Sequence, residues 1–182
     1  MPAWLNLPNF FTVSRLVLTP FVVLAILDGR HTTALGLFAL AGFTDFLDGA
    51  SARKLAMTTQ TGAYLDPIAD KCLLSGVFLA LLAAKIVPKW VVVIIFARDL
   101  LILAGVGIVL LFTTVRRFPP SIWGKWSTFT QIVTATVWMA RNALQVPALD
   151  SLAWLMLWPC VALTIYSGLD YTWRGIRISQ AH

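Results

Sequence analysis

The sequence contains no glutamate and few charged residues of any kind. Aspartate supplies all eight acidic residues; only 12% of the 182 residues are charged, whereas 59% are hydrophobic. Because soluble domains carry about 25% charged residues, this scarcity argues against a water-soluble fold. The chain also lacks the alternation of apolar and polar residues that is typical of membrane strands. Its apolar runs are long and continuous, which favours helices.

Two further absences limit the functions that are compatible with the sequence. The 14 Lys and Arg residues give a net charge of +6, but they are scattered and form no basic cluster. We therefore expect no nucleic-acid partner, and attribute the basic loops to membrane topology and attraction to anionic lipids. The chain has only two cysteines, Cys72 and Cys160, and both lie in apolar segments. This predicts two buried thiols rather than a disulfide.

What the sequence does contain is six long apolar segments. Twenty helical residues cross a bilayer core of about 30 Å, so a chain of this length has room for about six crossings. Pro8, Arg15 and Pro20 predict that the first segment begins as an interfacial helix and then turns into a span. We therefore expect an all-α fold, an integral membrane bundle of six transmembrane helices with a short N-terminal interfacial helix. The expected helices are 8–27, 32–53, 61–84, 88–112, 121–142 and 149–173, in a single domain over residues 1–182.

The basic residues between the segments predict the orientation. If both termini are cytoplasmic, that side carries Arg53, Lys54, Arg116, Arg117, Lys125, Arg174 and Arg177. The other side then carries Arg30, Lys85, Lys89 and Arg141. Since positive charge accumulates on the cytoplasmic side, seven against four favours both termini inside. We expect a bacterial-type inner or plasma membrane protein whose chemical site faces the cytoplasm.

Four of the eight aspartates fall in one stretch, DFLDGASARKLAMTTQTGAYLDPIAD, at residues 45–70. Asp45 and Asp48 are three residues apart at the end of the second segment, and Asp66 and Asp70 are four apart in the third. Residues at these spacings share one face of a helix. Two adjacent antiparallel helices joined by a short turn would therefore aim two carboxylate pairs at one point.

Burying these four carboxylates requires compensation. Each carboxylate in a membrane helix costs about 2.5–3.5 kcal/mol on insertion scales, and like charges close together repel. Divalent cations resolve both problems, because hard ions such as Mg²⁺ prefer oxygen ligands and paired metals suit displacement at phosphorus. The pattern therefore predicts a site for two divalent cations, Mg²⁺ or Mn²⁺.

Small residues and one arginine accompany the aspartates. Gly49, Ala52 and Gly62 would leave space in which a nucleotide or phosphate could approach the backbone. Arg53 offers a fork of donors to a phosphate. These residues extend the predicted cation site into a binding pocket for a phosphorylated substrate.

The complete pattern resembles the signature of the CDP-alcohol phosphatidyltransferase family. It runs Asp45-x-x-Asp48-Gly49-x-x-Ala52-Arg53, then eight residues, then Gly62-x-x-x-Asp66-x-x-x-Asp70. The stretches NLPNFFTVSR, ARDLL and GKWSTFTQ extend the similarity to the phosphatidylglycerophosphate synthase and cardiolipin synthase branches. The resemblance implies a six-helix membrane enzyme, usually a homodimer. Such enzymes attack the β-phosphorus of CDP-diacylglycerol with an alcohol and release CMP.

The resemblance also implies roles for the signature residues. Asp45, Asp48, Asp66 and Asp70 would surround the two metal ions, and Asp70 would accept the proton of the acceptor hydroxyl. Gly49, Ala52, Arg53 and Gly62 would line the CDP-binding pocket.

Three basic residues outside the signature are candidates for binding an acceptor or lipid phosphate. Arg15 either binds such a phosphate or extends to the lipid headgroups. Lys125 either binds such a phosphate or is an ordinary interfacial lysine. Arg98 lies near the middle of an apolar segment, where an unpaired cation is costly, so we expect it to meet a site aspartate or the acceptor phosphate. The neighbouring Asp99 points about 100° away on a helix, so it need not be the partner of Arg98.

The acceptor alcohol is the open question. The N-terminal and GKWST stretches favour glycerol 3-phosphate, which would give phosphatidylglycerophosphate. However, phosphatidylglycerophosphate synthases commonly have glutamate after the arginine of this fourth segment and a second arginine about seven positions later. Here Asp99 replaces the glutamate and no arginine lies between Gly105 and Gly107, which favours the alternative of a cardiolipin synthase that uses phosphatidylglycerol. A cation or proton transporter is a distant alternative. The carboxylates of a transporter would be spread through the depth of the bilayer, whereas the four aspartates here are concentrated at one cytoplasmic end.

Overall fold

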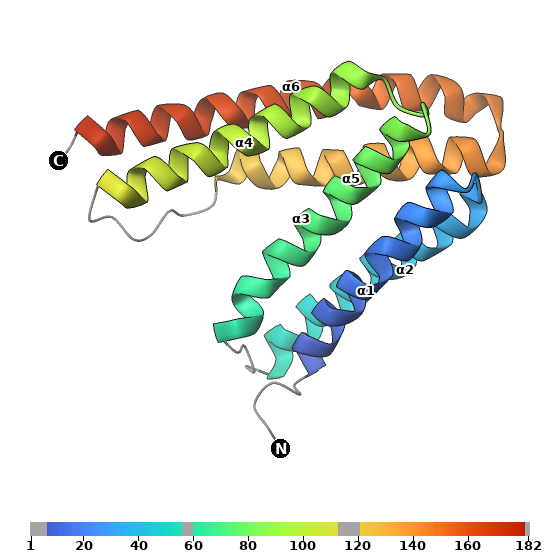
Figure 1. Ribbon diagram of the computed structural model, residues 1–182, viewed down its shortest axis with the longest axis horizontal. Helices are drawn as coiled ribbons and strands as arrows, with labels where there is room; N and C mark the ends of the chain where they lie inside the picture. Colours follow the sequence, from blue (N-terminus) through green and yellow to red (C-terminus); the bar gives the residue numbers. More distant parts are fainter. Residues whose placement is uncertain (1–6, 56–59, 113–120, 181–182) are drawn as a thin grey trace. The chain divides into compact units, whose positions relative to one another are not determined.

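The computed structural model describes residues 7–55, 60–112 and 121–180, and within them the side chains of 12–44, 68–105, 107 and 121–174. These residues form six α-helices and no strand (Figure 1), which confirms the all-α class and the expected number of helices. The helices are α1 (Leu7–Leu27), α2 (His31–Leu55), α3 (Gln60–Ala83), α4 (Lys89–Phe112), α5 (Ile122–Leu144) and α6 (Pro147–Gln180).

The chain divides into two compact units. The first consists of Met1–Ile86 and Trp138–Val146 and contains α1, α2 and α3. The second consists of Val87–Val137 and Pro147–His182 and contains α4 and α6. Helix α5 begins in the second unit and ends in the first. The expectation of a single domain over residues 1–182 stays a prediction.

In the first unit, α1 packs against both α2 and α3. Helices α1 and α3 run in the same direction and α2 runs opposite to them (Figure 1). A Cβ atom on Gly76 of α3 would lie 3.2 Å from Val23 Cγ2 and 3.4 Å from Thr19 Cγ2 of α1, so the missing side chain lets the two helices approach closely. The buried apolar side chains include Val22, Ile26, Phe38, Val77, Phe78 and Leu81.

Residues in the left-handed region close the helices of this unit. Gly29 has φ 71°; its N–H donates to the Ile26 carbonyl at 3.1 Å, and the Arg30 N–H donates to the Ala25 carbonyl at 2.9 Å. These two bonds satisfy carbonyl groups at the end of α1, which lack partners within the helix. Lys85 closes α3 in the same way at φ 57°, although a side chain makes this conformation less favourable than at glycine. The turn at Gly29 brings α2 back along α1.

In the second unit, α4 packs against α6, and polar side chains join α5 to α6. The Gln131 amide group donates to Ser127 Oγ at 3.3 Å and to Thr164 Oγ1 at 3.1 Å, and Thr164 donates to the Cys160 carbonyl at 2.7 Å. Gln131, Ser127 and Thr164 are fully buried. Hydrogen bonds of this kind hold helices together where the surroundings are apolar.

The first segment is a single helix, α1, from Leu7 to Leu27, and the interfacial position of its first part stays a prediction. Pro8 lies in the first turn, where its missing N–H removes no helical bond, and the helix continues through Pro20. Judged by length and hydropathy over the described residues, Pro147–Arg174 qualifies as a membrane span, whereas Thr12–Leu27 is apolar but shorter. Six spans are therefore not confirmed by this criterion.

The cysteines differ from each other in burial. Cys160 is a buried free thiol, as expected, but Cys72 is exposed, so that the prediction for Cys72 is wrong. The buried residues beside it in sequence are Leu73 and Leu74, which lie on other sides of α3. Exposing a thiol to an apolar environment costs little free energy, so a cysteine in an apolar segment is not necessarily buried.

Candidate active site

The aspartate-bearing stretch lies on two consecutive helices. Asp45 and Asp48 belong to the last part of α2, and Asp66 and Asp70 to the first part of α3. Both stretches are helical, as the spacing argument required, so each pair shares a helix face. The small and basic members of the signature, Gly49, Ala52, Arg53 and Gly62, lie on the same two helices. Asp70 is the one signature residue whose side chain lies within the described part of the chain.

Asp70 forms an ion pair with Arg15 of α1. Arg15 Nη1 donates to Asp70 Oδ1 within the first unit. The arginine side chain is buried, with 1% exposed, whereas the aspartate side chain is 49% exposed. A buried guanidinium needs a compensating carboxylate, and Asp70 supplies one. The sequence pattern identified both residues as candidate site residues, but it did not predict that they contact each other.

The donor set fits a divalent cation. The residues whose side chains are described contain no cluster of three or more His, Cys or acidic side chains, since three of the four signature aspartates lie outside them. Carboxylate oxygens are nevertheless the ligands that hard divalent ions prefer. The half-exposed Asp70 carboxylate lies at the edge of the α1–α3 packing, where it can contact a ligand outside that packing.

Arg98 is the centre of a second polar cluster, in the second unit. Its Nη1 donates to Asp99 Oδ1 at 2.9 Å and its Nη2 donates to Ser167 Oγ at 2.7 Å. The Arg98 and Asp99 side chains are 11% and 9% exposed, so the two charges compensate each other in a largely buried position. Asp99 is therefore an ion-pair partner of Arg98, although the two side chains leave the helix about 100° apart. The long arginine side chain reaches around the helix to Asp99.

Two glycines make room for the Arg98 side chain. A Cβ on Gly124 of α5 would lie 3.4 Å from Arg98 Nη2, and one on Gly168 of α6 would lie 3.4 Å from Arg98 Cγ. The guanidinium also lies 6.0 Å from the centre of the Tyr171 ring. Gly124 of α5 and Gly168 of α6 were the sequence signal that could have indicated a bulky side chain between α4, α5 and α6.

The start of α5 is fixed to α6 by residues that the sequence analysis did not single out. The Ser121 N–H donates to the Tyr171 hydroxyl at 2.9 Å, and the Ser121 hydroxyl donates to Asp170. Arg174 also donates to Asp170, at 3.0 Å. Lys125, in the first turn of α5, is exposed, so this candidate for phosphate binding is accessible.

The first unit carries the signature aspartates on α2 and α3 and a buried Arg15 beside Asp70, and the second unit carries Arg98 on α4 and Lys125 on α5. The sequence model of the family described as CDP-alcohol phosphatidyltransferase matches residues 5–166. The chain belongs to the CDP-alcohol phosphatidyltransferase family. The match includes α2 and α3 in full, and this family generally uses a divalent metal ion, in agreement with the donor set.

Individual CDP-alcohol phosphatidyltransferases are similar to this chain over most of its length. A probable phosphatidylglycerophosphate synthase of Mycobacterium tuberculosis (strain H37Rv) is 36% identical over 181 residues, which cover 94% of this chain and 82% of that protein. The CDP-diacylglycerol–glycerol-3-phosphate 3-phosphatidyltransferase of Bacillus subtilis (strain 168) is 32% identical over 199 residues, covering 96% and 99%. A probable cardiolipin synthase (CMP-forming) of Drosophila melanogaster is 31% identical over 174 residues, covering 83% and 53%.

Membership of the CDP-alcohol phosphatidyltransferase family decides the class of protein. The chain is an enzyme of phospholipid biosynthesis, a transferase, and not the cation or proton transporter that was the distant alternative.

Proposed function

We propose that this enzyme transfers the phosphatidyl group of CDP-diacylglycerol to glycerol 3-phosphate and releases CMP. The observation that carries the proposal is the similarity, over at least 94% of the chain, to two proteins named for phosphatidylglycerophosphate synthesis. The product is then phosphatidylglycerophosphate.

The proposed reaction is a displacement at phosphorus. The acceptor hydroxyl oxygen attacks the β-phosphorus of CDP-diacylglycerol and forms a new P–O bond. The bond between that phosphorus and the oxygen that bridges to the α-phosphorus breaks, and CMP leaves with this oxygen. The acceptor proton passes to the Asp70 carboxylate, which acts as the general base.

The signature residues would bind and orient the donor. Asp45, Asp48, Asp66 and Asp70 would hold two divalent cations, Mg²⁺ or Mn²⁺. When bound, such ions neutralise the pyrophosphate and improve CMP as a leaving group. Gly49, Ala52 and Gly62 would leave room for the CDP group, and Arg53 would donate to its phosphate oxygens.

The phosphate of glycerol 3-phosphate needs a cation. Lys125 is exposed, which supports it as the group that meets this phosphate. Arg98 is a second candidate, although Asp99 compensates its charge, and Arg15 is a third, although it is buried against Asp70. Since a rigid arginine fork and a mobile lysine recognise phosphate differently, substitutions at these positions would separate their roles.

The second candidate function is cardiolipin synthesis with phosphatidylglycerol as acceptor. Asp99 stands where phosphatidylglycerophosphate synthases commonly have glutamate, and α4 carries Gly105 and Gly107 but no second arginine between them. Phosphatidylglycerol brings its hydroxyl on a lipid, so fewer cations are needed than for glycerol 3-phosphate. The similarity to the Drosophila protein is consistent with this alternative.

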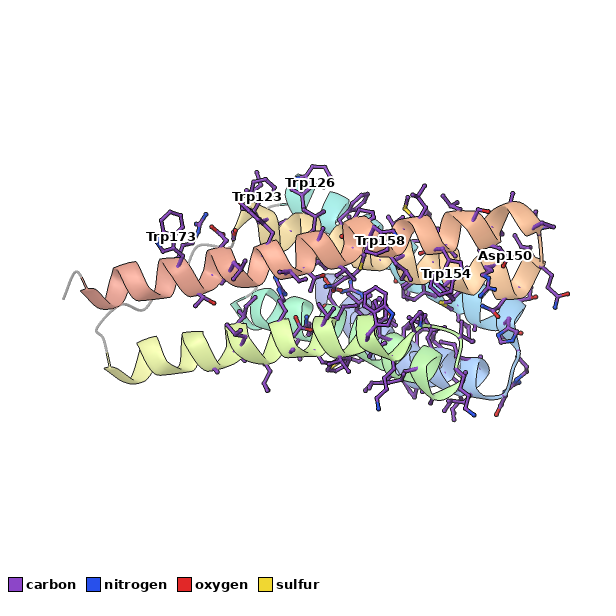
Figure 2. The ribbon with its side chains drawn as sticks, turned by 90° about the horizontal axis from the view of Figure 1, so that it is seen from above. Trp123, Trp126, Asp150, Trp154, Trp158 and Trp173 are labelled. Carbon is purple, nitrogen blue, oxygen red and sulfur yellow. The ribbon has the colours of Figure 1, made fainter. Side chains whose placement is uncertain are left out.

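We further propose that the six helices cross the membrane, with both termini and the site on the cytoplasmic side, and that the enzyme works as a homodimer. Figure 2 shows Trp154 and Trp158 toward the start of α6 and Trp173 toward its end. Trp154 and Trp173 are 52% and 60% exposed, and they are nineteen positions apart on α6, which is about 28 Å along the helix. Exposed tryptophans at this spacing match the two interfaces of a bilayer.

An acceptor panel tests the proposed function. The purified enzyme in lipid nanodiscs with Mg²⁺ and CDP-diacylglycerol would be given glycerol 3-phosphate, phosphatidylglycerol, inositol phosphate or serine, and CMP release would be measured. We expect glycerol 3-phosphate to give a kcat/KM at least tenfold above the others. A preference for phosphatidylglycerol would establish the second candidate instead, and no CMP release with any acceptor would contradict both.

A further inference from the structure

The ion pair between Arg15 and Asp70 connects the inside of the first unit to its surface. Arg15 exposes 1% of its side chain and Asp70 exposes 49%, so the cation is inside the α1–α3 packing and the carboxylate is at its edge. An arginine that binds the phosphate of a substrate has to present its guanidinium to that substrate. Arg15 instead presents its Nη1 to the Asp70 carboxylate.

The position of Arg15 is fixed by the packing of α1 on α3. The Thr19 hydroxyl, one turn further along α1, donates to the Arg15 carbonyl at 2.9 Å. A methyl group of the same Thr19 lies against Gly76, where α3 has no side chain. Arg15 and Asp70 are therefore held on two parallel helices in close contact, and the carboxylate that accepts from Arg15 has a restricted orientation.

We propose that Arg15 is a positioning residue for Asp70, and this rests on the proposed role of Asp70 as the base that accepts the acceptor proton. The guanidinium holds Oδ1 and so orients the carboxylate toward the substrate side of α3. Arg15 does not bind the acceptor phosphate. The result is a general base whose geometry is fixed before the substrates bind, which is the condition under which proton transfer is efficient.

Kinetic constants separate positioning from phosphate binding. Arg15→Met removes the charge and the donors at similar length, and Arg15→Lys keeps the charge but loses the rigid fork. Positioning predicts that Arg15→Met lowers kcat on the order of 100-fold while KM for glycerol 3-phosphate stays within about twofold, with Arg15→Lys between it and the wild type. A tenfold higher KM with unchanged kcat would overturn the proposal and return Arg15 to phosphate binding.

Arg30→Met is the matched control. Arg30 also pairs with an aspartate, Asp28, but this pair is exposed, with 61% and 52% of the side chains accessible, in the turn between α1 and α2. The substitution makes the same change of charge and size away from Asp70. We expect both kinetic constants to match those of the wild type; a loss of kcat equal to that of Arg15→Met would overturn the proposal.

A second readout needs no turnover. Binding of Mn²⁺ alone, followed by electron paramagnetic resonance, reports on the carboxylate that Arg15 shares with the ion. Because Arg15 orients a carboxylate that is also a ligand of the ion in the proposed function, Arg15→Met should raise the Kd for Mn²⁺ severalfold, whereas Arg30→Met should leave it unchanged. An equal or lower Kd in Arg15→Met would overturn the proposal. Because this measurement is independent of the acceptor, it distinguishes a wrong role for Arg15 from a wrong choice of reaction.

Discussion

At the scale of single residues, two ion pairs of the described residues differ in the accessibility of their carboxylates. Arg15 is buried and Asp70 is half-exposed, whereas Arg98 and Asp99 are both nearly buried. An accessible carboxylate can exchange a proton with a substrate, and an inaccessible one can only compensate a charge. The difference in burial supports the proposed catalytic role of Asp70, and the pairing of Asp99 with Arg98 supports a structural role for Asp99.

The carboxylate of Asp70 should be necessary for transfer but not for binding of the donor. In Asp70→Asn, the amide oxygen can still accept from Arg15, so the α1–α3 contact is kept, but the amide cannot take the acceptor proton. We expect CDP-diacylglycerol to bind within about threefold of wild-type affinity and kcat to fall by roughly 10²–10⁴-fold. Equilibrium binding of the labelled donor and CMP release are the two measurements.

Asp150→Asn is the control for this prediction, since Asp150 is exposed in the first turn of α6 (Figure 2). It should leave transfer unchanged, because Asp150 lies outside the signature, in a first helical turn where a carboxylate interacts favourably with the helix dipole. Full transfer activity in Asp70→Asn would show that another group accepts the proton.

Single-residue patterns predicted the helices that carry the signature residues, but not the contacts between helices. The aspartate spacings indicated helices at 45–53 and 62–70, and both stretches are helical. The Arg15–Asp70 and Arg98–Ser167 contacts join residues 55 and 69 positions apart. No local pattern encodes such distances; they follow from which helices pack together.

At the scale of helices, close approach depends on single glycines. Gly76 is a position at which α3 touches α1 without a side chain, with would-be Cβ contacts of 3.2 and 3.4 Å. It lies six residues after Asp70 on α3. The distance between α1 and α3 at this glycine therefore bears on whether Arg15 reaches Asp70.

Gly76→Leu should separate the two helices. A leucine would overlap with Val23 and Thr19, and overpacking of this kind costs about 1–3 kcal/mol, equivalent to a Tm roughly 2–10 °C lower. Because the ion pair is stretched, we also expect kcat to fall more than the KM for glycerol 3-phosphate rises. Thermal unfolding in detergent and steady-state kinetics would measure both effects.

Gly36→Leu provides the comparison, because nothing lies within 4 Å of a Cβ at this exposed position of α2. This substitution should change neither Tm nor kcat. Equal effects of the two substitutions would mean that leucine disturbs the helices wherever it is placed, and that the α1–α3 contact has no special importance.

The helix boundaries were predictable from apolar runs and prolines to within a few residues, with one exception. Helix α6 extends to Gln180, beyond the expected end at residue 173. The apolar pattern ends near Trp173, but helical hydrogen bonding continues into a polar segment. Hydropathy marks where a helix can meet lipid, and it does not mark where the helix itself ends.

At the scale of the whole molecule, the distribution of basic residues predicts which ends of the helices face the cytoplasm. Lys85 lies in the turn after α3 and Lys125 in the first turn of α5, and both are exposed. With both termini inside and six crossings, these two lysines lie on opposite sides of the membrane. The reverse orientation would exchange the sides of the two lysines.

Labelling of single cysteines tests this topology. Lys85→Cys and Lys125→Cys would each be made in a background that carries Cys72→Ser and Cys160→Ala, and intact cells would be treated with a membrane-impermeant maleimide. We expect Lys85→Cys to be labelled in intact cells and Lys125→Cys only after the membrane is opened, because the reagent needs an accessible thiolate in water. The parent without cysteines controls for background. The reverse pattern would place Lys125, and with it the proposed acceptor phosphate site, outside the cytoplasm, where CDP-diacylglycerol and glycerol 3-phosphate could not meet as the proposed reaction requires.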